Sequence, residues 1–138
     1  MTDHAAQGPT TGLTPHLSVG HGHAGKAIEF YVAAFGAVEK ARIPAEDGQR
    51  LMHAHLIINN GSLMLADDFP EFHGGAYTPP AAVTLHLQVD DTDAWYARAV
   101  AAGAVPRMPP EDMFWGDRYA QLDDPFGFTW ALGAPIAG

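Results

Sequence analysis

The chain contains no cysteine, few basic residues and no long apolar run. Without cysteine there is no disulfide framework, iron–sulfur cluster, thiolate zinc site or cysteine nucleophile. The 7 lysines and arginines against 16 aspartates and glutamates give a formal net charge of −9, which disfavours contact with nucleic acid or anionic membranes. No segment approaches the roughly 20 consecutive apolar residues of a membrane span, and the first residues lack the regions of a secretory signal. We therefore expect one compact cytoplasmic domain without nucleic acid or membrane partners.

An internal repeat organises the sequence. Residues 13–19 alternate apolar and polar side chains, as a strand with one buried face does. The pattern Thr-x-His-Leu-x-Val begins at Thr14 and returns 70 positions later at Thr84. Each of these strands leads into a helix-like segment that ends at a glycine, Gly36 in the first copy and Gly103 in the second. Three further strand candidates follow each helix, at 37–43, 50–59 and 62–67, and at 105–108, 113–122 and 127–133.

The element order βαβββ therefore occurs twice, which predicts an α+β fold. We expect two tandem modules that form a cupped, partly closed sheet with the helices on its outer face. Residues 1–12 are small and polar without a period, which predicts a mobile tail. The remaining chain, 13–138, divides into module one at 13–67, a linker rich in glycine and proline at 68–81, and module two at 82–138.

Strand alternation assigns a set of polar and aromatic residues to the concave face of this cup. Between Leu51 and Ile58 the even positions are all apolar, so His53 and His55 share the other face. Aligning the two modules places Tyr119 and Gln121 at the equivalent positions of module two. The predicted ligand-binding set is His16, His53, His55, His86, Trp115, Asp117 and Tyr119. Aromatic walls with a few convergent polar groups are typical of small-molecule pockets.

Several segments together carry a family resemblance: residues 13–15, 27–31, 34–37, 63–67, 114–119 and 124–127. In order and spacing they resemble the PhnB-like branch of the glyoxalase/bleomycin-resistance/dioxygenase superfamily, also called vicinal oxygen chelate proteins. The resemblance spans nearly all of residues 13–133. It implies paired βαβββ modules and usually a homodimer.

The resemblance also implies where a glyoxalase would hold its metal, at positions that fall on Thr14, Leu65, Thr84 and Ala131 of this chain. Leucine and alanine cannot coordinate a metal, and threonine is a poor donor for a divalent transition metal. The expected function is therefore binding of a small molecule in the concave pocket without the glyoxalase metal set. Such a protein resembles antibiotic-sequestering members of the superfamily, which bind drugs without converting them.

Other interpretations remain open from the sequence, which leaves undecided whether the chain is an enzyme. The main alternative is a divalent-metal-dependent lyase, isomerase or dioxygenase that uses His16, His55 and His86 in a shifted site. The simpler interpretation is that the histidines are polar groups that form hydrogen bonds within the sheet. A third hypothesis is an accessory subunit whose acidic surface contacts a partner. No catalytic residue and no resident cofactor are assigned, and the divalent metal belongs to the alternative alone.

Overall fold

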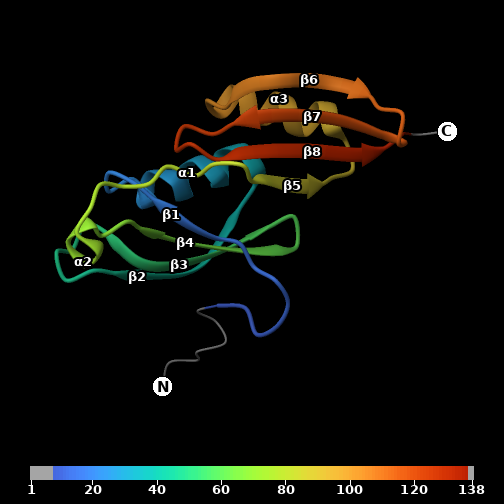
Figure 1. Ribbon diagram of the computed structural model, residues 1–138. Helices are drawn as coiled ribbons and strands as arrows, with labels where there is room; N and C mark the ends of the chain where they lie inside the picture. The colour runs from blue at the N-terminus through green and yellow to red at the C-terminus, as the bar shows by residue number, and fades with distance from the viewer. Residues whose placement is uncertain (1–7, 137–138) are drawn as a thin grey trace. The chain divides into compact units, whose positions relative to one another are not determined.

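The structure is a computed structural model that describes residues 8–136. Within that range the chain forms eight strands and three helices (Figure 1). In chain order they are β1 (His16–Val19), α1 (Ala24–Phe35), β2 (Val38–Pro44), β3 (Leu51–Ile58), β4 (Gly61–Asp67), α2 (Pro70–His73), β5 (Thr84–Gln88), α3 (Thr92–Ala102), β6 (Val105–Asp112), β7 (Asp117–Asp123) and β8 (Thr129–Pro135).

Each module forms its own four-stranded mixed sheet. The strand orders are β1-β4-β3-β2 and β5-β8-β7-β6, so the two sheets have the same topology. In each sheet the first strand of the module pairs parallel with the last strand, and the other pairs are antiparallel. The predicted α+β fold of two βαβββ modules is therefore confirmed. The chain divides into two compact units, with the boundary along the sequence between Pro79 and Pro80. Residues Ala33–Phe35 belong to the second unit.

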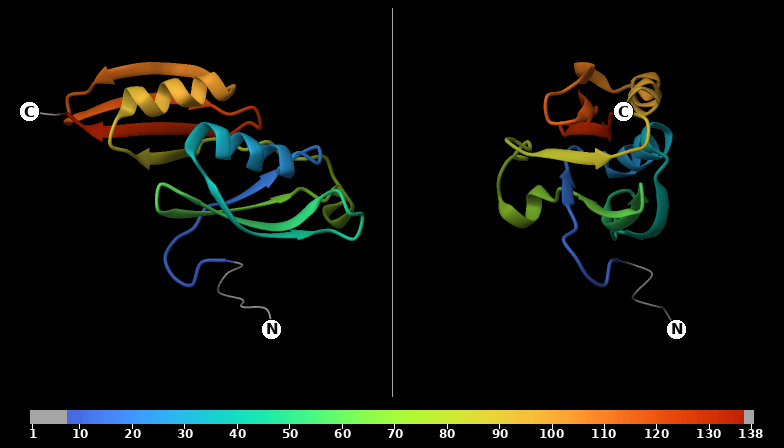
Figure 2. Two further views of the ribbon diagram at one scale, coloured as in Figure 1. Left: turned by 180° about the vertical axis from the view of Figure 1, so that it is seen from behind. Right: turned by 90° about the vertical axis from the view of Figure 1, so that its right-hand side faces the viewer.

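In the second unit, α3 lies along one face of the sheet and contacts β6, β7 and β8 (Figure 2). The Asp91 side chain caps this helix by accepting from the Ala94 N–H at 3.1 Å, and Gly103 ends it in a left-handed conformation. Leu122, Trp130 and Leu132 are buried on the apolar side of the sheet. Because side chains alternate along a strand, the polar residues between them lie on the other face.

In the first unit, the register sets Leu17 beside Leu65, and Leu65 beside Ala54, and all three side chains are buried. The buried carboxylate of Asp67 joins the end of β4 to two other elements. It accepts the N–H of Ala24, at the start of α1, at 2.9 Å and the N–H of Leu51, at the start of β3, at 2.7 Å. This carboxylate therefore fixes where α1 and β3 begin.

Several element boundaries differ from the prediction. Strand β1 begins at His16, because Leu13 is fully exposed and has no partner strand there. Strand β7 begins at Asp117, because residues 113–116 form a turn in which the Gly116 N–H bonds the Met113 carbonyl. The even-numbered face of β3 is buried except for Met52, which is 49% exposed.

The predicted linker 68–81 contains a short helix, α2, and the predicted tail at 1–12 lies mostly outside the described residues. Proline at the first position of α2 suits the start of a helix, since that position needs no backbone hydrogen-bond donor. Over residues 8–136, no helix has the length and apolar character to cross a membrane.

Candidate functional site

On the polar face of the second sheet, small residues of the central strand β8 lie beneath larger side chains of the neighbouring strands. The floor of this arrangement is β8, where Ala131 and Gly133 are the residues on this face. Two cross-strand rows run over it: His86 (β5), Ala131, Gln121 (β7) and Met108 (β6) form one, and Gln88, Gly133, Tyr119 and Glu111 form the next. The walls are therefore His86 and Gln88 on one side and Tyr119 and Gln121 on the other. We call this arrangement the module-two trough.

Tyr119 is the centre of the contacts in the trough. The His86 ring lies nearly parallel to it, with centroids 6.1 Å apart and planes inclined by 14°. The Trp115 ring meets it edge-on at 5.5 Å. The Gln121 Nε2 group donates to the Tyr119 hydroxyl at 2.9 Å, and His86 Nε2 lies 2.8 Å from Gln88 Oε1. Aromatic pairs at these separations are mutually stabilising, so both contacts help to hold the tyrosine ring.

Gly133 allows this arrangement. A Cβ atom on Gly133 would lie 2.9 Å from Cε1 of His86 and 3.2 Å from Oε1 of Gln88. Carbon atoms in contact are normally separated by about 3.5–4.0 Å. Glycine is therefore required for the histidine and glutamine to lie close to the strand.

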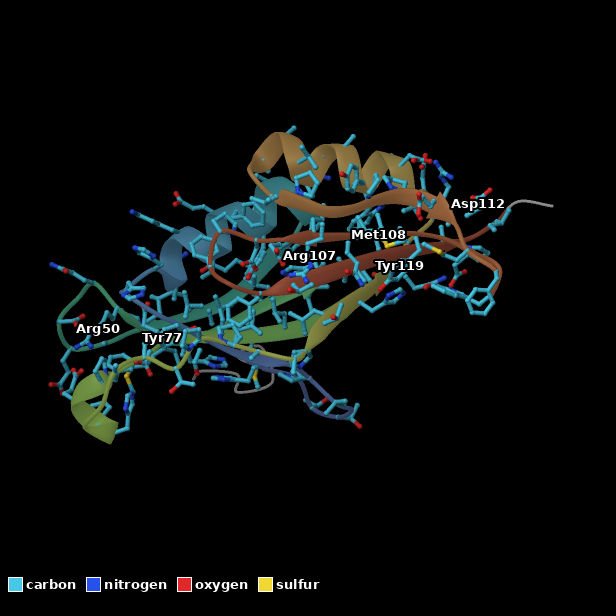
Figure 3. All side chains as sticks on the ribbon, turned by 45° about the horizontal axis from the view of Figure 1, so that its top comes forward. Arg50, Tyr77, Arg107, Met108, Asp112 and Tyr119 are labelled. Carbon is cyan, nitrogen blue, oxygen red and sulfur yellow. The ribbon has the colours of Figure 1, made fainter. Side chains whose placement is uncertain are left out.

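A groove of about 610 Å³ continues the trough at its Gln121 end. Its lining includes Thr84, Arg107, Gln121, Asp123 and Thr129. The Asp123 carboxylate accepts the Thr129 hydroxyl at 2.8 Å and lies 3.3 Å from the Arg107 guanidinium. Figure 3 marks Tyr119, Met108 and Arg107 along the β6–β7 side of the sheet and Asp112 at the end of β6. The second unit thus presents an aromatic end and a charged end on one face.

The first unit holds the other three predicted histidines on one face of its sheet. His16 lies opposite Met64, and Met64 lies opposite His55, so the three form a row across β1, β4 and β3. His53 is two residues before His55 on the same side of β3 and is half-buried, whereas His16 is exposed. The alternation used in the sequence analysis therefore places these residues together within this unit.

His55 is the buried member of that row. Its side chain is 5% exposed, and its Nε2 atom lies 2.9 Å from the Ser62 hydroxyl. Its Nδ1 atom has no hydrogen-bond partner among the described residues. Burial lowers the pKa of His55, and the nearby charges of His53 and Lys40 lower it further. The lowered pKa favours the neutral imidazole, and Nδ1 is itself a buried atom.

Trp115 and Asp117 differ in setting from the other predicted residues. Trp115 was expected on a strand, but it lies in the turn between β6 and β7 and is 51% exposed. It reaches the trough through its contact with Tyr119 and meets the Phe114 ring edge-on at 5.1 Å. Asp117 is the first residue of β7 and is half-buried opposite Pro135 at the end of β8.

Sequence reasoning missed Gly133, Arg107 and Asp123. A glycine inside a strand is a known signal of close approach by another group, so Gly133 could have been found. Arg107 and Asp123 carry no such signal, because a charged residue at a strand end is usually only solvated.

The cross-strand register corrects one equivalence between the modules. Met64 lies opposite His16 as Ala131 lies opposite His86, so Met64 and Ala131 correspond. Leu65, which the resemblance pointed to, is fully buried on the other face. Across residues 8–136, no three or more histidine, aspartate or glutamate side chains are grouped so that they could hold a metal ion.

A family model and a relative of known sequence each match most of this chain. The family model described as Glyoxalase/Bleomycin resistance protein/Dioxygenase superfamily matches residues 14–132. An uncharacterised protein of Mycobacterium bovis, Mb0911c, is 48% identical over 129 residues, covering 90% of this chain and 83% of that protein.

Solved structures share the fold. Protein PA1353 from Pseudomonas aeruginosa has a TM-score of 0.75 at 24% identity, covering 91% of this chain and 98% of that one. A PhnB protein from Bacillus cereus has a TM-score of 0.69 at 20% identity, covering 90% and 99%. At these identities the two structures support the fold alone.

Proposed function

Since this chain belongs to the glyoxalase/bleomycin resistance protein/dioxygenase superfamily, we propose that it binds a small organic molecule in the module-two trough. The observation that carries the proposal is the arrangement around Tyr119, where two further rings and an amide converge over a floor of alanine and glycine. Small-molecule sites combine apolar and aromatic walls with a few fixed polar groups in this way. The adjoining groove of about 610 Å³ lies within the size range of such sites.

On this face of the second sheet, polar side chains lie at one end and exposed aromatic surface lies at the other. Trp115 is 51% exposed and offers ring surface to a ligand. The side chains of Thr84, Thr129, Arg107 and Asp123 offer hydrogen bonds at the groove end. A ligand with a flat apolar part and a polar part fits this division.

We further propose that binding proceeds without the glyoxalase metal set. Thr14, Thr84 and Ala131 remain poor or impossible ligands, and the corrected fourth position, Met64, offers only a thioether. The first-unit residues His16, His53 and His55 are proposed as an additional ligand-contacting surface, with the exposed His16 as its most accessible member. Asp117 is proposed to border the aromatic end of the trough.

The experiment is a screen of small aromatic fragments by ligand-observed NMR, with the Trp115→Ala and Phe72→Ala variants beside the wild type. Phe72 is a matched control, because it is an aromatic side chain in the first unit that is 75% exposed. We expect fragments that lose their signal with Trp115→Ala and keep it with Phe72→Ala. Hits that survive in the Trp115→Ala variant would contradict the site. Recovery of the bound compound with unchanged mass is expected, and a converted product would contradict binding without chemistry.

A further inference from the structure

Tyr119 carries a hydroxyl proton that the described residues do not use. The Gln121 Nε2 group can only donate, so in their 2.9 Å hydrogen bond the phenolic oxygen is the acceptor. Within residues 8–136 the Tyr119 hydroxyl makes no hydrogen bond as a donor. Accepting a hydrogen bond also polarises the hydroxyl and makes it a better donor.

The surroundings of Tyr119 restrict which acceptor could receive that proton. The tyrosine ring is held by His86 on one face and by the Trp115 edge, so the hydroxyl has a defined position. Carboxylates lie along the same strand and its neighbour: Asp117 and Asp123 are the two ends of β7, and Glu111 lies opposite Tyr119 on β6. Asp123 is paired with Arg107, so the charges of Asp117 and Glu111 are the ones that disfavour an anionic ligand at Tyr119.

We propose that the trough selects uncharged, flat carbonyl compounds, and that the Tyr119 hydroxyl, held by Gln121, donates to their carbonyl oxygen. This inference rests on the proposed function and names the ligand class of the same site. The aromatic surface of Trp115 takes the flat part of the ligand.

The test compares acetophenone with ethylbenzene, which has nearly the same shape and lacks the oxygen. Binding of both compounds is measured near neutral pH, by NMR titration of the protein amides, to the wild type and to the Tyr119→Phe, Gln121→Glu and Gln121→Met variants. A glutamate at position 121 cannot donate a hydrogen bond, so its carboxylate would instead accept one from the Tyr119 hydroxyl. A methionine at that position leaves the Tyr119 hydroxyl available to donate to a ligand.

We expect the wild type to bind acetophenone about 3- to 10-fold more tightly than ethylbenzene, the range expected for one hydrogen bond. The preference should disappear in Tyr119→Phe and in Gln121→Glu and should persist in Gln121→Met. The preference is taken as the ratio of the two affinities within each protein, and a wild-type amide NMR pattern in the first unit and in α3 shows that each variant is folded.

Equal binding of the two compounds to the wild type would overturn the inference about the hydroxyl and leave the proposed binding site standing. A preference for acetophenone that survives in Tyr119→Phe would likewise overturn the inference about the hydroxyl. If neither compound perturbs the second unit up to millimolar concentration, the proposed site itself is contradicted.

Discussion

Replacing Gly133 by alanine tests whether the module-two trough is held by close packing. The added Cβ would lie 2.9 Å from Cε1 of His86, so the ring must retreat by about 1 Å to reach normal contact. That movement weakens the hydrogen bond to Gln88 and the near-parallel contact with Tyr119. Each contact is worth about 0.5–1.5 kcal/mol, and the exposure of His86 puts both near the lower end.

The same substitution also stabilises through the unfolded chain. Alanine restricts the unfolded state and favours folding by about 0.4–1 kcal/mol where the backbone accepts it, and Gly133 is not left-handed. The two effects nearly cancel, so we expect Gly133→Ala to change the free energy of unfolding by less than about 1 kcal/mol.

Gly25→Ala is the matched control. Gly25 lies in α1, is not left-handed, and an added Cβ would meet nothing within 4 Å. There alanine should raise the free energy of unfolding by about 0.5–1 kcal/mol.

The assay combines thermal unfolding with NMR of the histidine ring resonances. In Gly133→Ala we expect the His86 resonances to shift and the stability to fall below that of Gly25→Ala. If Gly133→Ala is as stable as Gly25→Ala and leaves the His86 resonances in place, the close packing over β8 is refuted.

Three further predictions concern the carboxylates and histidines of the two units. Asp124→Ala should lower the free energy of unfolding by about 3–5 kcal/mol in denaturant titrations, because two backbone N–H groups and an indole N–H lose their buried acceptor. Asp124→Asn keeps one acceptor oxygen and should lose less, and equal losses in the two variants would contradict the role of that oxygen. The folded-state pKa of His55 lies below its ordinary value of 6.5, so the wild type should lose stability as the pH falls below about 6.5, where the unfolded chain takes up a proton that the folded chain does not. His55→Gln should flatten that part of the plot of unfolding free energy against pH. An unchanged slope would contradict the lowered pKa of His55. The pKa of Glu71 is held at about 2 chiefly by hydrogen bonds from Arg50, whereas that of Asp47 is held at about 2 first by the Gln49 backbone N–H and then by Arg50. In carboxyl NMR titrations Arg50→Gln should therefore raise the pKa of Glu71 toward 4.5 and that of Asp47 by less, and a Glu71 pKa that stays near 2 would contradict the role of Arg50.

The repeat in the sequence was sufficient to predict the fold. Because each module repeats the same alternating strand and glycine-ended helix, the order of elements followed from the amino-acid sequence alone. Gly36 and Gly103 do end α1 and α3 in left-handed conformations. The strand edges were harder to place. Strand β6 runs on through Pro109 and Pro110, which an edge strand tolerates because one side of it has no partner.

The candidate site was predictable in part. Alternation placed the histidines and Tyr119 on their faces correctly, because the pleat fixes side-chain direction once a strand is identified. Alternation wrongly placed Trp115 on a strand, because β7 begins only after the turn at 113–116. That turn depends on Gly116, with φ of 100°, and on a hydrogen bond from the Met113 N–H to the Asp117 carbonyl. Which residues lie opposite one another depends on register, which periodicity alone cannot give. The predicted homodimer stays a prediction.

The most direct test of the central claim is a map of amide NMR shifts in the wild type during titration with the strongest fragment from the screen. We expect the largest shifts on residues 84–88, 115–121 and 129–133, the three segments that line the trough. Shifts confined to other segments of the chain, with these three unchanged at saturation, would contradict the account.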